Sequence, residues 1–147
     1  MYKNGAKQYQ QVNITSEVLD ADPHRLIQML MEGALLRMVQ AKAAIERNDM
    51  ATKASLLGRV TEIIQTLRGS LNHDVGGEIS TNLDSLYDYM VHRLLEATMQ
   101  NDTSMIDEVM RLLVEVKSGW DGIREEFLKS TGAVHSAAGP TGAYVSA

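Results

Sequence analysis

Apolar residues recur at intervals of three and four along most of this sequence, and this spacing restricts the chain to amphipathic helices. The clearest run places seven apolar side chains on one stripe: Ile106, Val109, Leu113, Val116, Trp120, Ile123 and Phe127. No segment alternates apolar and polar residues at period two, so we expect no β-sheet. The predicted fold class is all-α.

Prolines and Asn-Asp pairs mark where the helices begin and end. Asp22 before Pro23 is typical of a helix start, because Asp caps the first turn and Pro fits its first position. Asn48-Asp49 and Asn101-Asp102 interrupt the apolar stripes, and residues 72–77 read as a glycine-containing loop. We predict four helices, at about residues 23–47, 50–71, 78–100 and 103–127, after a short helical turn at 16–21. Short connections between long helices favour an antiparallel up-down four-helix bundle.

The chain divides into three predicted parts. We expect a flexible N-terminal arm at residues 1–14, a helical bundle domain at 15–128 and a disordered C-terminal tail at 129–147. The first residues, MYKNGAKQYQQVNI, lack the apolar stretch of a signal peptide, and no apolar run is long enough to cross a bilayer. These features predict a cytoplasmic protein without membrane insertion.

The composition argues against several classes of function. The chain has no Cys, which excludes thiolate metal sites and thiol nucleophiles, and its net charge of −5 argues against a nucleic-acid partner. The four His are scattered, and the one pair that could hold a metal, Asp88 and His92, falls on a polar helix face. No phosphate-binding loop is present. We therefore predict a protein that is not an enzyme and that has no cofactor and no metal.

The first long helix differs from the others because it carries apolar residues on two opposite faces. A wheel at about 100° per residue places one stripe on Ile27, Met31, Ala34, Met38, Ala41 and Ile45. The second surface consists of Met29, Leu36, Val39 and Ala43, flanked by Leu26 and Gly33. A four-helix bundle covers only one of these faces, so the N-terminal arm or a partner must cover the other. The arm offers Tyr2, Tyr9, Val12 and Ile14.

Several motifs together resemble the flagellin-specific export chaperones, the FliS family. They are YQQVNI at residues 9–14, PHRLI at 23–27 with Leu30 and EGA at 32–34, SLN at 70–72, GGEI at 76–79, NL at 82–83, LYDYM at 86–90, RL at 93–94, Asp102, DEV at 107–109, LL at 112–113 and Trp120. The resemblance extends from about Tyr9 to Trp120. It departs from the family at Met31, where a Tyr is common.

The resemblance implies an antiparallel helical bundle that binds the C-terminal region of flagellin in the cytosol. Binding would prevent premature polymerisation and assist delivery to the flagellar type III export apparatus, with a component of the export gate as a further partner. The predicted partner-binding residues are Tyr9, Val12, Ile14, Leu26, Met29, Leu30, Gly33, Leu36 and Val39. The alternative is a non-enzymatic bundle whose second apolar face mediates homodimerisation.

Overall fold

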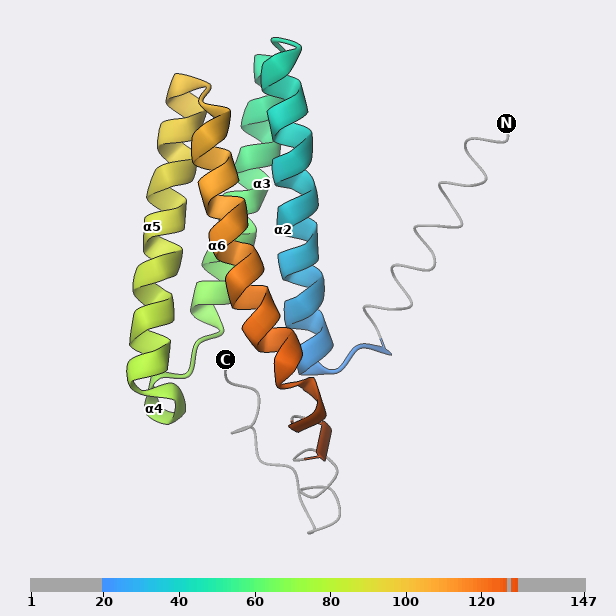
Figure 1. Cartoon of the computed structure of the whole chain (residues 1–147), viewed down its shortest axis with the longest axis vertical. Coiled ribbons are helices and arrows are strands. Elements are labelled where there is room, and N and C mark those ends of the chain that lie inside the picture. Colours follow the sequence, from blue (N-terminus) through green and yellow to red (C-terminus); the bar gives the residue numbers. More distant parts are fainter. Residues whose placement is uncertain (1–19, 127, 130–147) are drawn as a thin grey trace, which may run out of the picture.

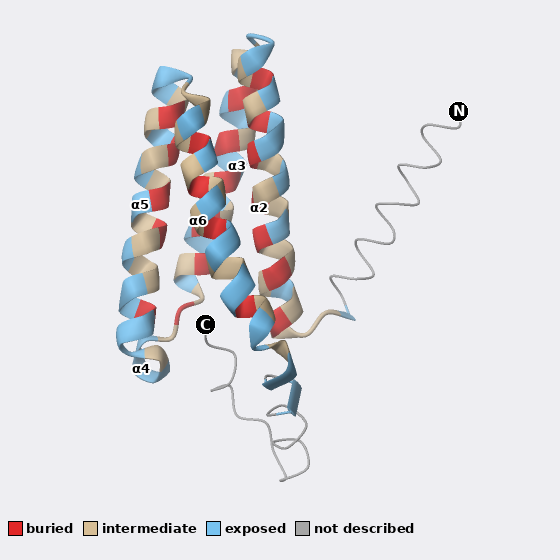
Figure 2. Ribbon diagram, viewed as in Figure 1, coloured by how far each residue is buried: buried red, intermediate tan, exposed pale blue. Residues whose placement is uncertain are grey.

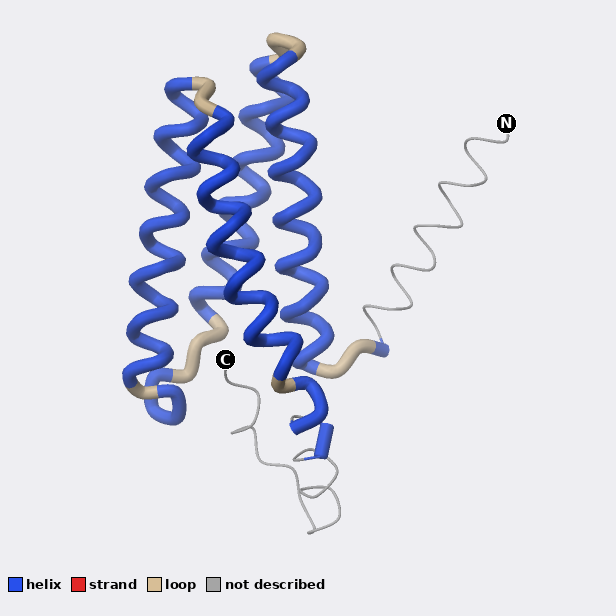
Figure 3. The backbone as a smooth tube through the Cα atoms, in the orientation of Figure 1, coloured by secondary structure: helices blue, strands red, loops and turns tan. Residues whose placement is uncertain are grey.

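The computed structural model describes residues 20–126, 128 and 129, and these residues form helices and short turns without a strand (Figures 1 and 3). The helices are α2 (Pro23–Glu46), α3 (Met50–Gly69), α4 (His73–Gly76), α5 (Glu78–Gln100) and α6 (Thr103–Gly122). The predicted arm at residues 1–14 lies outside the described residues, as do most of the predicted turn at 16–21 and of the tail at 129–147.

The helix starts follow the capping signals of the sequence. The Asp22 carboxylate accepts a hydrogen bond from the Arg25 N–H at 2.7 Å, with Pro23 in the first turn of α2. Asp49 and Asp102 cap α3 and α6 in the same way. The residue before each of these two caps, Asn48 or Asn101, is left-handed, with φ of 59° and 55°. Asn tolerates this conformation better than other residues with a side chain, which explains both Asn-Asp breaks.

Three predicted boundaries are wrong. The predicted loop at residues 72–77 contains the single-turn helix α4, which Asn72 caps by accepting from two N–H groups. Gly77, with φ of 51° and ψ of −120°, then redirects the chain into α5, a conformation that requires Gly. The second helix ends at Gly69 instead of Leu71. Helix α6 ends at Gly122, and residues 124–126 form a separate helical stretch; the predicted end, Phe127, lies outside the described residues.

The four long helices form an antiparallel bundle in which each helix contacts two neighbours, α2 with α3, α3 with α5, α5 with α6, and α6 with α2 (Figure 1). Buried residues face the bundle axis along all four helices (Figure 2). The core consists mainly of aliphatic side chains and Met, with Tyr87 and Trp120 as the large aromatic residues. This arrangement confirms the predicted all-α four-helix bundle.

Charged side chains connect neighbouring helices at the margins of the core. The Arg68 guanidinium on α3 lies 2.7 Å from a carboxylate oxygen of Asp84 and 3.1 Å from one of Asp88, both on α5. Arg93 on α5 lies 2.7 Å from Glu108 on α6. These hydrogen bonds lower the pKa of the Asp84 and Glu108 carboxyls.

A buried lysine joins the two helical hairpins at the end where both turn. Lys53 is only 6% exposed. Its ammonium donates to the Thr98 carbonyl at 2.8 Å and to the Asn101 side-chain oxygen at 2.6 Å, at the C-terminus of α5. A cation at this position satisfies a terminal carbonyl and opposes the negative end of the helix dipole.

Candidate functional site

The outer face of α2 exposes a row of aliphatic side chains. Leu36 is 56% exposed and Val39 is 52% exposed, and Leu26 also remains open to solvent. Met29 and Gly33 are half-buried. Leu30 is half-buried too, but it packs against the core. Helices α3 and α6 cover the opposite stripe, in which Met31, Ala34, Met38 and Ala41 are buried, so this surface has no partner among the described residues.

The row spreads over two sides of the outer face of α2. Gly33 lies on the α3 side, because a Cβ at this position would be 3.9 Å from Ile63 of α3. Val39 is about 60° around the helix from Leu36, in the direction of Lys42, which pairs with Asp107 of α6. The predicted α2 residues therefore form a broad surface rather than a narrow stripe.

A second apolar surface, which the sequence did not reveal, is a cleft of about 530 Å³ at the opposite end of the bundle from the Asn-Asp turns. It lies between α4, the start of α5 and the end of α6, with Met31 of α2 also in its lining. Its residues are Met31, Val75, Gly76, Ile79, Leu83, Tyr87, Glu115, Val116, Gly119, Trp120 and Ile123. Of these, Glu115 alone carries a charge. A cavity of this size lies in the range that holds small ligands or a few side chains.

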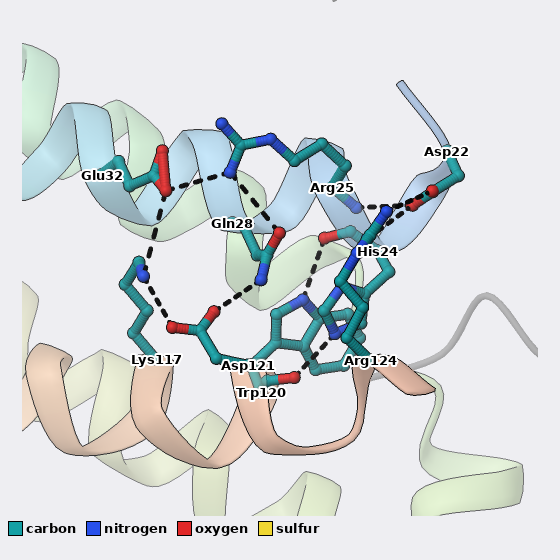
Figure 4. A network of polar contacts seen from close by, with 9 residues as sticks. All are labelled: Asp22, His24, Arg25, Gln28, Glu32, Lys117, Trp120, Asp121 and Arg124. Carbon is teal, nitrogen blue, oxygen red and sulfur yellow. Dashed lines mark hydrogen bonds and ion pairs between the residues drawn. The ribbon is translucent and has the colours of Figure 1, made fainter. Parts of the chain in front are cut away.

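A buried ring pair fixes Trp120 at the edge of this cleft. His24 of α2 stacks on Trp120 of α6, with the ring centroids 4.6 Å apart and the planes 7° from parallel (Figure 4). The Trp120 Nε1–H donates to the His24 carbonyl at 3.0 Å, and the His24 Nε2–H donates to the Trp120 carbonyl at 2.6 Å. Each residue thus donates a hydrogen bond to the main-chain carbonyl of the other. This reciprocal pair fixes the position of the start of α2 relative to the end of α6.

Ionic contacts extend this junction toward solvent. The Arg124 guanidinium donates to both carboxylate oxygens of Asp22, at 3.2 and 2.8 Å, and to Nδ1 of His24 at 3.1 Å (Figure 4). The hydrogen bond from Arg124 lowers the pKa of the Asp22 carboxyl. On the other side, the Gln28 amide donates to Asp121 at 2.7 Å. The junction therefore ties the N-cap of α2 directly to the residues that follow α6.

The pair considered as a metal site is used in local contacts. The Asp88 carboxylate accepts from Arg68 at 3.1 Å, and the His92 Nδ1–H donates to the Asp88 main-chain carbonyl at 2.8 Å. Within residues 20–126, 128 and 129, no group of three or more His, Cys, Asp and Glu side chains is placed to hold a metal ion. In the same part of the chain, no helix combines the length and the hydropathy needed to span a membrane. Tyr9, Val12 and Ile14, the predicted arm contacts, lie outside the described residues.

Sequence comparison identifies the class of protein to which this bundle corresponds. The profile of the family described as "Flagellar protein FliS" matches residues 5–126, so the chain belongs to the FliS family. It is 56% identical over 117 residues to "Flagellar secretion chaperone FliSB" of Pseudomonas aeruginosa, covering 80% of this chain and 93% of the relative. It is 41% identical over 125 residues to "Flagellar secretion chaperone FliS" of Vibrio cholerae, covering 85% and 92%.

A third relative and a solved structure agree with this assignment. The chain is 42% identical over 121 residues to "Flagellar secretion chaperone FliS" of Salmonella typhimurium, covering 82% and 90%. A structure described as "Crystal structure of flagellar chaperone from bacteria" superposes with a TM-score of 0.67 at 17% identity, covering 82% of this chain and 98% of that one, which supports the fold. The relatives are named as chaperones, which confirms the predictions of the family and of a protein that is not an enzyme.

Proposed function

We propose that this chain binds the C-terminal region of flagellin in the cytoplasm, prevents its premature polymerisation and assists its delivery to the flagellar type III export apparatus. The observation that carries the proposal is the row of exposed Leu26, Leu36 and Val39 on the outer face of α2. This face lies on a chain of the FliS family, whose relatives are named flagellar secretion chaperones. A protein whose task is to hold a secretion substrate needs such an unoccupied apolar surface.

The proposed contact is the docking of an amphipathic segment along α2. A client segment that orders on binding pays a conformational cost, which burial of apolar surface must exceed. The exposed leucines and valine supply that surface from the first turn to the middle of α2, while the half-buried Met29 can change rotamer to fit different side chains. In this proposal Tyr9, Val12 and Ile14 of the N-terminal arm contribute further apolar contacts.

The direct test is calorimetric titration with the C-terminal segment of the host's flagellin, comparing Leu36→Asp with the wild type. Fully burying a Leu side chain is worth about 1.5–3 kcal/mol, and Leu36 has 56% of its surface left to bury. The contact is therefore worth about 0.8–1.7 kcal/mol, and its loss weakens binding at least about 4-fold. The fold should remain intact, because surface substitutions change stability by about 0.5 kcal/mol or less.

Leu95→Asp is the matched control. Leu95 lies on α5 and is 57% exposed, so it has nearly the same exposure as Leu36 in a different part of the bundle. The proposal requires a loss of affinity in Leu36→Asp and wild-type binding in Leu95→Asp. Equal loss in both variants would indicate a non-specific hydrophobic contact, and wild-type binding in both would remove the outer face of α2 from the site.

The second candidate function is homodimerisation through the same outer face of α2. Light scattering distinguishes it from the proposed chaperone function, because a dimer held by this face dissociates when Leu36→Asp introduces a charge. A wild-type monomer at the concentrations used for titration would eliminate this candidate. A dimer that dissociates in Leu36→Asp but not in Leu95→Asp would favour it.

A further inference from the structure

The cleft between α4, α5 and α6 leaves a large apolar area uncovered by the described residues. Ile79 is 67% exposed, and Val75 and Ile123 also remain open to solvent. These side chains surround a hollow of about 530 Å³ whose only charged lining residue is Glu115. Contiguous exposed apolar surface of this kind normally has an occupant.

The chain itself continues from the edge of the cleft. Gly119, Trp120 and Ile123, at the end of α6, form one side of the lining. Lys129 is only six positions after Ile123 in the sequence, and residues 130–147 then follow. Eighteen residues can span up to about 60 Å, so this segment can return to the cleft without any movement of the bundle.

The chemistry of the segment matches the lining. Residues 130–147 contain no Asp, Glu, Lys or Arg, and they include Val134, Tyr144 and Val145. Without these side chains, Tyr144 and its neighbours can enter an apolar cleft without the cost of desolvating a charged side chain. Residues 1–19, the other segment that could reach the cleft, carry Lys3, Lys7 and Glu17 and match it less well.

We propose that residues 130–147 fold back onto the bundle and place Tyr144 and Val145 in the cleft. The Tyr144 ring supplies the large apolar group that the cavity accommodates, and its hydroxyl can donate to the Glu115 carboxylate at the margin. The matched family profile ends at residue 126, so this cover is a feature of this chain beyond the shared bundle. The inference concerns the free protein and is independent of the proposed function.

Disulfide trapping tests the proposal in the full-length chain. The sequence has no Cys, so the variant Tyr144→Cys with Ile79→Cys contains one pair of thiols. A disulfide requires Cα atoms about 4.4–6.8 Å apart, and mild oxidation should form it rapidly within one chain. The control is Tyr144→Cys with Leu95→Cys, because Leu95 lies on the same helix as Ile79, about 24 Å further along, and is also exposed.

Rapid intramolecular trapping at Ile79 and slow trapping at Leu95 would support the proposal. Equal rates at both positions would overturn it, because they describe a tail that samples the whole surface. Disulfide-linked dimers that increase with protein concentration would also overturn it and assign the cleft to a second copy. A third result would also overturn the proposal. If the disulfide formed faster in the variant Tyr9→Cys with Ile79→Cys than in the variant Tyr144→Cys with Ile79→Cys, the N-terminal arm would be the occupant of the cleft.

A measurement on the native chain provides an independent check. The chain has one Trp, and that residue lines the cleft. Removal of residues 130–147 should shift Trp120 emission to the red and increase its quenching by acrylamide, with unchanged far-UV circular dichroism. Identical Trp120 emission and quenching in the full-length and shortened chains would contradict the proposed cover.

Discussion

Replacing Lys53 by Met should destabilise the bundle more than any other single Lys→Met change among the described residues. The ammonium of Lys53 is buried and donates to the Thr98 carbonyl and the Asn101 side chain, at 2.8 and 2.6 Å. Met fills the same space but leaves both acceptors without this donor. Hydrogen bonds to charged groups contribute about 1.5–3 kcal/mol each, and the cost of burying the ammonium offsets part of their sum.

We therefore expect Lys53→Met to lower the free energy of unfolding by about 1.5–3 kcal/mol. For a chain of this length each kcal/mol corresponds to about 2–4 °C in Tm, which gives a decrease of about 3–12 °C. Urea denaturation followed by circular dichroism measures the first quantity and a thermal scan the second.

Lys42→Met is the control for this prediction. Lys42 pairs with Asp107 at the surface, and the side chains are 31% and 50% exposed. An exposed pair of this kind contributes about 0–1 kcal/mol. If Lys53→Met were as stable as the wild type, burying the ammonium would cost as much as its hydrogen bonds contribute, and the prediction that Lys53 stabilises the contact between the hairpins would be wrong.

Three further predictions test separate features of the bundle. Burial raises the pKa of Tyr87 to about 12, so the folded state holds the phenol proton more tightly than the unfolded state. The free energy of unfolding should therefore fall by about 2 kcal/mol as the pH rises from about 10 to 12. Tyr87→Phe should not show this contribution when urea titrations at the two pH values are compared. Gly33→Ala should raise the free energy of unfolding by about 0.5–1 kcal/mol, because the new Cβ makes an ordinary contact with Ile63, at 3.9 Å, and its one close neighbour is the flexible end of Arg37, at 3.0 Å; lower stability would show that Arg37 cannot move aside. Asp22→Ala should cost about 1–2 kcal/mol, because it removes the cap of α2 and the Arg124 pair, whereas Asp22→Asn keeps the cap and should cost less; equal losses in urea titration would assign the whole effect to Arg124.

The sequence predicts the helix starts well because their signals are local. Asp22, Asp49 and Asp102 each accept a hydrogen bond from an N–H two or three residues further along, so the pattern is visible in a short window. The exposed face of α2 is also predictable from a short window, because the helical period alone places Leu36 and Met31 on different faces of the helix. The predicted arm contacts depend on residues outside the described part of the chain and remain predictions.

The cleft and the junction were not predictable because their contacts join distant parts of the chain. Ile79 and Leu83 share one stripe of α5, yet Ile79 is largely exposed and Leu83 packs against the core. Periodicity cannot make this distinction, because it depends on how far the neighbouring helices extend. His24 is one of four scattered His in the sequence, and its stacking partner Trp120 lies 96 residues away.

The two Asn-Asp turns have a consequence for the order in which the molecule folds. Only residues 47–49 separate α2 from α3, and only residues 101–102 separate α5 from α6. Each hairpin therefore closes through neighbours in sequence, and such local topologies fold in microseconds to milliseconds. On the ribosome, the first hairpin can form as soon as its second helix has emerged, before α5 has been synthesised. We expect the slow step to be the docking of the two hairpins, so substitutions at Lys53 and Arg68 should change the folding rate more than substitutions at the turns.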